Sequence, residues 1–152
     1  MRLTRYSDYA MRVLLYLAAR DDQPCSISEM AAAYGISQNH LMKVLNDLGR
    51  AGFVVSTRGR NGGFRLARPA AQINVGQLLR HTEDDLQLVD CPSCVLSPAG
   101  CGLSSVLDEA LMAFLSVLDG YSLADLLTRR HGFGSLIQSL GRDRASPHLA
   151  RQ

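Results

Sequence analysis

The chain has 152 residues, 47% of them hydrophobic, which is enough for one compact domain with a buried core and an attached helical segment. Its formal net charge of +2 is unevenly distributed: residues 1–80 hold eleven Lys/Arg and five Asp/Glu, a balance of +6, and residues 81–152 hold five and nine, a balance of −4. This asymmetry fits a nucleic-acid-binding module joined to a part that need not touch phosphate, while the lack of any run of about 20 apolar residues excludes a membrane-spanning helix.

The N-terminus does not resemble a secretory signal, because Arg2, Arg5 and Asp8 interrupt it before any apolar run of sufficient length. We therefore expect a cytoplasmic protein with no membrane partner. Disulfides are disfavoured in that compartment, so clustered cysteines are expected to bind metal or to act as redox switches.

Two helices are predicted before the first glycine. Apolar residues at helical spacing indicate a helix over 8–20, and a shorter helix runs through 29–33. Gly35 lies in the turn over 34–37 and tolerates the positive φ that a tight corner between helices often needs. The candidate cap residues are Thr4 or Ser7 for the first helix and Ser26 or Ser28 for the second.

A third helix is predicted over 38–51, with Ser37 as its cap and Gly52 at its C-terminal end. Its core-facing positions are Leu41, Val44, Leu45 and Leu48. A helix, a glycine-bearing turn and a second helix form the DNA-binding arrangement, so this is the candidate recognition helix. Amides at its start pair well with adenine edges, and a lysine one turn later is expected to contact phosphate. The candidate DNA contacts are Gln38, Asn39, His40 and Lys43.

Two segments with strand character, 53–56 and 64–67, flank residues 58–63, whose Asn-Gly step predicts a hairpin. A basic hairpin directly after a recognition helix is a wing. Its arginines are candidate contacts with phosphate or with the minor groove, and they are Arg58, Arg60 and Arg65. Tri-helical units also serve as protein-interaction modules, but the basic wing favours DNA as the partner.

The second half is predicted to contain a helix over 73–81 capped by Asn74, a cysteine-bearing loop, and a long helix over 102–118. Apolar residues at alternating spacings of three and four give the long helix a stripe that one small domain cannot cover, so we interpret it as a dimerisation helix. The expected fold is thus mainly α: a winged helix-turn-helix with a two-stranded β-wing and a long C-terminal dimerisation helix. The predicted units are the DNA-binding domain over 1–80, the cysteine loop over 81–101, the dimerisation helix with a short following helix over 102–130, and a disordered tail over 131–152.

Three cysteines lie within eleven residues: Cys91, Cys94 and Cys101. Three thiolates can hold an iron–sulfur cluster if a fourth group completes the set. A four-thiolate zinc site normally needs a second pair at matching spacing, which the chain lacks, and Cys91 and Cys94 could instead be a thiol–disulfide pair. The residues alone leave a cluster, zinc and a thiol switch open. Cys25 stands apart and is expected to be a buried small hydrophobe.

No constellation typical of an enzyme stands out. The sequence has no phosphate loop, no zinc-protease spacing and no nucleophile elbow, and its four histidines are scattered. We therefore expect a protein that is not an enzyme.

Several segments together resemble a family of winged-helix transcription regulators with iron–sulfur branches of the NsrR and IscR types. The similarity covers about residues 1–130 and is carried by the three-cysteine loop and by residues 3–14, 36–44 and 58–66. Segments 88–91 and 118–126 are most similar to the NsrR type, the branch that senses nitric oxide.

This resemblance implies a homodimeric repressor of nitric oxide detoxification genes, which binds a double-stranded DNA operator and responds to nitric oxide. It implies one iron–sulfur cluster per subunit, 4Fe–4S in the first place and 2Fe–2S as the alternative. The implied ligands are Cys91, Cys94 and Cys101, with Asp8 supplied by the partner subunit and oriented by Arg12 one helical turn later. Without the resemblance, Asp8 is simply an acidic residue favoured at a helix N-terminus.

Other functions remain as alternatives. The protein could be a cluster-sensing regulator of iron–sulfur biogenesis or redox balance, a cluster-free thiol-switch regulator, or a carrier that stores a cluster. The cysteine gaps here, two and six residues, depart from the spacing usual in the family. Ser104 stands where the IscR branch has a histidine ligand, which argues against an IscR-type site.

Overall fold

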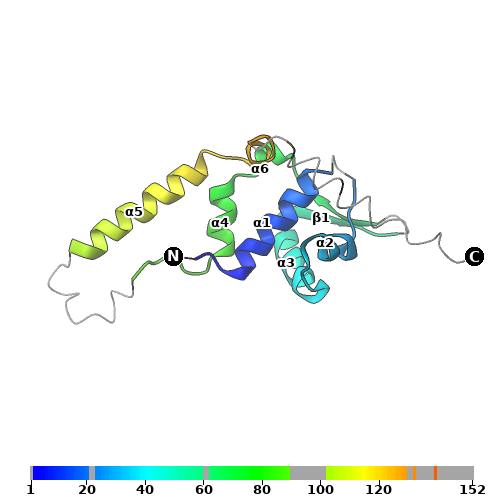
Figure 1. The fold of residues 1–152 in the computed structure, drawn as a ribbon, viewed down its shortest axis with the longest axis horizontal. Helices are drawn as coiled ribbons and strands as arrows, with labels where there is room; N and C mark the ends of the chain where they lie inside the picture. Colours follow the sequence, from blue (N-terminus) through cyan, green and yellow to red (C-terminus); the bar gives the residue numbers. More distant parts are fainter. Residues whose placement is uncertain are drawn as a thin grey trace, which may run out of the picture.

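The computed structural model describes residues 2–20, 23–59, 62–89 and 102–129, together with Gly132 and Ser139. Helix α1 contacts α2, α3, α4, α6 and strand β2, while α5 extends outward beyond α4 (Figure 1). The predicted fold class is confirmed, because the described residues are mainly helical with a two-stranded antiparallel sheet. In chain order the elements are α1 (Arg5–Ala18), α2 (Ile27–Tyr34), α3 (Gln38–Arg50), β1 (Val54–Thr57), β2 (Gly63–Leu66), the 3-10 helix η1 (Ala70–Gln72), α4 (Val75–Thr82), α5 (Gly102–Asp119) and α6 (Leu123–Thr128).

Helix α1 begins three residues earlier than predicted, at Arg5, because Thr4 rather than Ser7 is its cap. The backbone of Thr4 is extended, and its hydroxyl accepts a hydrogen bond from the Ser7 backbone N–H at 3.2 Å. This bond satisfies one of the amide groups that the first turn of a helix leaves without a partner. Ser7 is consequently inside the helix and fully buried.

The turn between α2 and α3 has the predicted backbone. Ser26 and Glu29 form a capping box at the start of α2, with hydrogen bonds of 2.7 and 3.2 Å. Gly35 ends the helix in the left-handed region, with φ 65° and ψ 31°, a conformation that strains any residue with a Cβ. Ser37 then caps α3 by accepting from the His40 backbone N–H at 3.3 Å. The helix-turn-helix is therefore encoded locally, residue by residue.

The core sits between α1, α2 and α3 and continues under the wing and α6. All four residues predicted to face inward from the recognition helix are buried, at 0 to 2% exposure. Side chains of this size each contribute roughly 1.5–3 kcal/mol when they are fully buried. The largest fully buried side chains of these three helices are Leu14, Tyr16, Met30, Leu41, Leu45 and Leu48.

The wing pairs β1 with β2 in a register that places Val54 opposite Leu66 and Thr57 opposite Gly63. Cys25 forms an isolated antiparallel bridge with β2, because the backbones of Cys25 and Phe64 exchange two hydrogen bonds of 2.8 Å. A Cβ on Gly63 would lie 2.6 Å from the Cys25 carbonyl oxygen, so the close approach of these two segments requires glycine there.

Cys25 is 3% exposed, as predicted for a buried small hydrophobe. Burial raises the pKa of its thiol to about 11, with a smaller effect of Glu29 in the same direction and an opposing effect of Arg20. The thiol is therefore protonated at neutral pH, which makes it a poor nucleophile and a poor ligand.

Helices α4 and α6 and the end of α5 are joined through Asn74. Its side chain caps α4 by accepting from the Gln77 backbone N–H at 2.9 Å, and its amide donates to the Asp119 carbonyl at 2.6 Å. The guanidinium of Arg80 forms two hydrogen bonds with the Asp119 carboxylate, at 2.6 and 2.8 Å. The last turn of α5 is thus held against α4.

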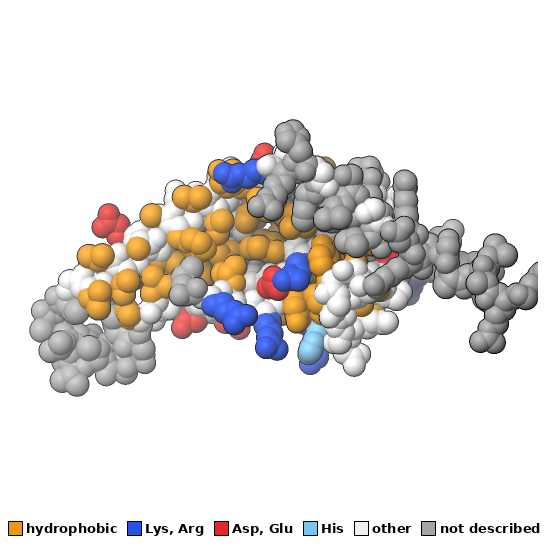
Figure 2. Space-filling view, in the orientation of Figure 1, with side chains coloured by type: hydrophobic (Ala, Val, Ile, Leu, Met, Phe, Trp, Pro, Cys, Tyr) orange, Lys and Arg blue, Asp and Glu red, His pale blue; other side chains and the backbone are white. Residues whose placement is uncertain are grey.

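Helix α5 has two apolar faces rather than the single stripe predicted. Along one side of the helix, Leu115 is buried and Leu107, Leu111 and Leu118 are half-buried, and α5 contacts α4. A second stripe, with spacings of three, four, three and four, is exposed, and hydrophobic side chains follow the helix in Figure 2. This exposed stripe consists of Leu103, Val106, Ala110, Ala113 and Val117.

The tail predicted to be disordered, 131–152, lies outside the described residues apart from Gly132 and Ser139. Within the described ranges, no helix combines the length and the hydropathy needed to cross a membrane.

Candidate DNA-binding surface and cluster site

The recognition helix presents its predicted contacts to the outside. Gln38, Asn39 and His40 form its first turn and Lys43 follows one turn later, and all four are exposed. The His40 ring also lies 6.3 Å from the ring of Tyr9 on α1, measured between centroids. The first turn of α3, which normally enters the major groove, is therefore open to a ligand.

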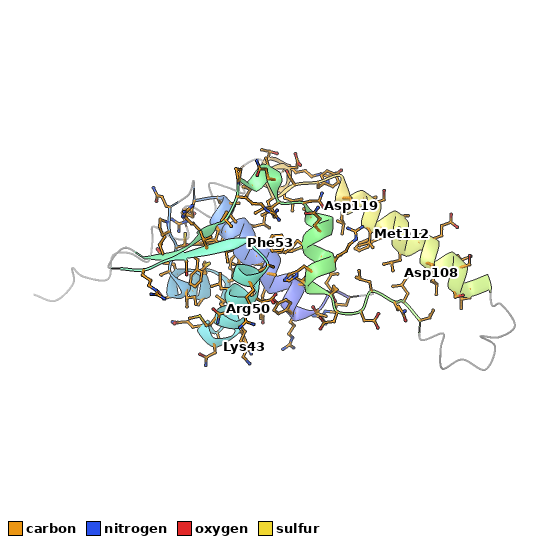
Figure 3. All side chains as sticks on the ribbon, turned by 180° about the vertical axis from the view of Figure 1, so that it is seen from behind. Lys43, Arg50, Phe53, Asp108, Met112 and Asp119 are labelled. Atoms are coloured by element: carbon orange, nitrogen blue, oxygen red, sulfur yellow. The ribbon has the colours of Figure 1, made fainter. Side chains whose placement is uncertain are left out.

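Sequence reasoning missed two further residues on the outer side of α3. Met42 is 44% exposed and lies among polar side chains. Arg50 is exposed in the last turn of α3, seven residues after Lys43 (Figure 3). A separation of seven residues places Lys43 and Arg50 on the same side of the helix. Helical spacing from Lys43 was the pattern that could have identified Arg50 as a second candidate phosphate contact.

On the wing, Arg58 is exposed and Arg65 is half-buried on β2, opposite Val55. Arg60, at the tip, lies outside the described residues. Lys43, Arg50 and Arg58 thus provide exposed cations on both parts of a winged helix-turn-helix.

Asp8 and Arg12 form an ion pair on α1. The Arg12 Nε donates to Asp8 Oδ1 at 2.8 Å, and the Arg12 and Asp8 side chains are 45% and 44% exposed respectively. The Arg12 guanidinium also lies 5.9 Å from the centroid of the Tyr34 ring. The guanidinium therefore orients an acidic group that stays open to the outside.

The three clustered cysteines, Cys91, Cys94 and Cys101, lie outside the described residues. Among the residues that the structure describes, no group of three or more His, Cys, Asp or Glu side chains is arranged to hold a metal ion. The described chain ends after Val89 and resumes with Gly102 at the start of α5. The cysteine segment thus lies in the chain between residues 83–89, which follow α4, and the outward-pointing helix α5.

Where the chain leaves α4, an open cavity of about 520 Å³ lies between α1, α3 and the segment after α4. Glu83 is buried at its edge and accepts from the backbone N–H and the hydroxyl of Thr4, at 2.8 and 3.1 Å. Burial opposes ionisation of Glu83, but hydrogen bonds from Ser7 and Thr4 lower its pKa. The segment that leads to the cysteines therefore starts against the first turn of α1.

A second polar contact in this cavity joins three helices. Asp47 of α3 accepts a hydrogen bond from the Tyr6 hydroxyl of α1, and its Oδ2 lies 2.8 Å from His81 Nε2 of α4. The hydrogen bond from Tyr6, together with a weaker one from His81, lowers the pKa of Asp47 against the opposing effect of burial. Burial and the contact with Asp47 raise the pKa of Tyr6.

These features define the class of protein: a winged-helix DNA-binding regulator with an exposed recognition helix and basic wing. The pattern of the Rrf2 family, described as iron-dependent transcriptional regulators, matches residues 3–129. The chain therefore belongs to the Rrf2 family, and it is a transcription regulator rather than an enzyme, as the sequence predicted.

Relatives of known name agree with this assignment. The HTH-type transcriptional regulator NsrR of Bacillus licheniformis is 46% identical over 143 residues, which cover 90% of this chain and 99% of that protein. NsrR of Geobacillus kaustophilus is 48% identical over 144 residues, covering 91% and 97% of the two chains. The solved structure of IscR from T. potens aligns with a TM-score of 0.69 at 27% identity, over 85% of this chain and 88% of that one. The resemblance to NsrR-type regulators inferred from the sequence is confirmed.

Replacing Lys43 with alanine should weaken DNA binding for all sequences alike and reduce the salt dependence of the binding constant. Neutralising one phosphate-binding cation lowers the slope of log K against log salt by about 0.9. The measurement is a fluorescence titration of duplex DNA at several salt concentrations. Arg129→Ala is the matched control, because Arg129 follows α6 and lies 4.6 Å from the Tyr121 ring centroid. An unchanged slope for Lys43→Ala would show that Lys43 does not bind phosphate.

Proposed function

We propose that the protein is a cytoplasmic, homodimeric repressor of nitric oxide detoxification genes, whose affinity for its operator depends on an iron–sulfur centre that nitric oxide destroys. The observation that carries the proposal is the exposed Asp8–Arg12 pair on α1, in a chain that places three thiols between α4 and α5. The names of the NsrR relatives and the iron dependence in the family description support it.

The donor set fits such a centre. Thiolates are the ordinary protein ligands of iron–sulfur clusters, and Cys91, Cys94 and Cys101 would supply three of them. Cys25 is not suited to this role, because it is buried and its thiol is protonated. Asp8 would supply the fourth ligand across the dimer, since its carboxylate is 44% exposed. When bound, the centre would supply reactivity toward nitric oxide, with 4Fe–4S as the proposed type.

The proposed ligands would connect the two subunits and so fix the positions of their recognition helices. Arg12 holds Asp8 in one orientation, so the carboxylate meets its partner without a search through rotamers. Ligation of Asp8 would tie the segment between α4 and α5 of one subunit to α1 of the other. Because α1 packs against α3, that tie would fix the spacing of the two recognition helices. A two-fold dimer reads half-sites one turn apart only when these helices lie about 34–36 Å from each other.

Anaerobic purification combined with a nitric oxide titration tests this proposal. We expect a brown protein that contains iron and sulfide. It should bind a 30-base-pair duplex, about three turns of B-DNA, that the loaded protein has itself selected from a random library. Nitric oxide should bleach the visible absorption and lower the affinity by about a hundredfold, equivalent to about 2.7 kcal/mol. A colourless protein with stoichiometric zinc, or equal binding by the loaded and stripped forms, would contradict the proposal.

A further inference from the structure

The contact between Asp47 and His81 joins the DNA-reading elements to the root of the cysteine segment. Asp47 lies on the recognition helix α3, four residues after Lys43, and His81 lies in the last turn of α4. The two side chains meet at 2.8 Å although they are 34 residues apart in sequence. Glu83, two residues beyond His81, is fixed to Thr4 at the start of α1.

His81 also reaches the wing. Its ring lies 5.6 Å from the ring of Phe53, measured between centroids, and Phe53 immediately precedes β1. The Arg68 guanidinium also lies close to Phe53, 5.2 Å from the ring centroid. One imidazole at the end of α4 therefore contacts the recognition helix through a carboxylate and the wing through an aromatic ring.

We propose that Asp47 and His81 are positioning residues through which the segment after α4 sets the placement of the recognition helix and the wing. The inference rests on the proposed function, because it concerns how the state of the cysteine segment reaches the DNA-reading surface. Tyr6 belongs to the same contact, since its hydroxyl donates to the Asp47 oxygen that also faces His81. A displacement of the chain at residue 83 would thus shift the contacts that this segment makes with α1, α3 and the wing together.

The exposure of the Asp47 and His81 side chains favours a role in positioning α3 over a role in stabilising the fold. The Asp47 and His81 side chains are 41% and 33% exposed, and ion pairs with this exposure contribute little to folding. The recognition helix is already anchored by four buried side chains on its inner face. The contact is therefore expected to add little to the stability of the fold, but it lies where it can select one orientation of α3 relative to α4.

The test compares the affinities of the loaded and stripped forms for the duplex selected by the wild-type loaded protein. Two variants are measured: Asp47→Ala, and His81→Leu, in which leucine keeps an apolar side chain against Phe53. In each of them the ratio of loaded to stripped affinity should fall by about tenfold, a typical coupling between two sites. The visible absorption should not change. The double variant should lose no more than either single variant, because both remove the same contact. Tyr121→Phe, a hydroxyl deletion between α5 and α6, should leave the ratio unchanged.

The outcomes separate the two proposals. Equal binding by the two wild-type forms would overturn the proposed function and the coupling with it. A wild-type ratio that persists in both single variants, or an equal loss of affinity in the loaded and stripped forms, would overturn the coupling alone. If Asp47→Ala does not fold, Tyr6→Phe replaces it, because this change removes only the hydroxyl that donates to Asp47. A lower ratio of loaded to stripped affinity in Tyr6→Phe would support the coupling, and an unchanged ratio would overturn it.

Discussion

The Cys101→Ala protein is expected to purify without visible absorption and to bind the selected duplex about a hundredfold more weakly than the loaded wild type, a loss of about 2.7 kcal/mol. The physical reason is the place of Cys101, directly before Gly102 at the start of α5. A ligand at this point would tie the segment after α4 to the helix proposed to carry the dimer contact. Without it, three ligands remain, and the proposed tie to α1 is broken.

Cys25→Ala is the control for this experiment, because it also removes one thiol, but from the buried position where Cys25 bridges to Phe64 of the wing. It should keep the absorption and the DNA affinity, and it should lower the free energy of unfolding by about 0.5–3 kcal/mol, as expected for truncation of a buried residue. Iron analysis, anisotropy titration and thermal denaturation measure these three quantities. Full operator binding by Cys101→Ala would contradict the sensory role of the cysteine segment.

The elements of the N-terminal half were predictable because their determinants are local. Ser37 caps α3, Gly35 provides the turn before it, and the apolar spacing identifies its buried side. The start of α1 was ambiguous, since Thr4 and Ser7 are both good caps. In the structure Thr4 is the cap, and Glu83 accepts hydrogen bonds from both its backbone N–H and its hydroxyl. That choice depends on a residue 79 positions away, which no local pattern reveals.

The same limit applies to the site. The DNA-contact candidates follow from their places on a helix and a hairpin, and Asp8 was identified only through the resemblance to a family. Asp47 and His81 were missed because neither shows an unusual pattern along the chain. An aspartate near the end of a helix and a histidine at the end of another become meaningful only when packing brings them to 2.8 Å.

The second large effect is expected on α5. Replacing Val106 with aspartate should convert the proposed dimer into a monomer and lower operator affinity by at least about a hundredfold. Val106 is 62% exposed in the isolated chain and lies on the exposed stripe whose central members, Ala110 and Ala113, permit close approach of a second helix. Pairing two such stripes would bury the new carboxylate without a counter-charge, which costs several kcal/mol.

Met112→Asp is the matched control, because Met112 is 63% exposed on the same helix, and helical spacing places it on a different side from the stripe. Sedimentation equilibrium should therefore give a monomer for Val106→Asp and a dimer for Met112→Asp. The monomer should retain its helical content, since α5 still packs against α4 through Leu115 and its half-buried neighbours. A dimer for both variants would place the subunit contact elsewhere on the molecule, and a monomer for both would mean that charge anywhere on α5, rather than this stripe, decides association.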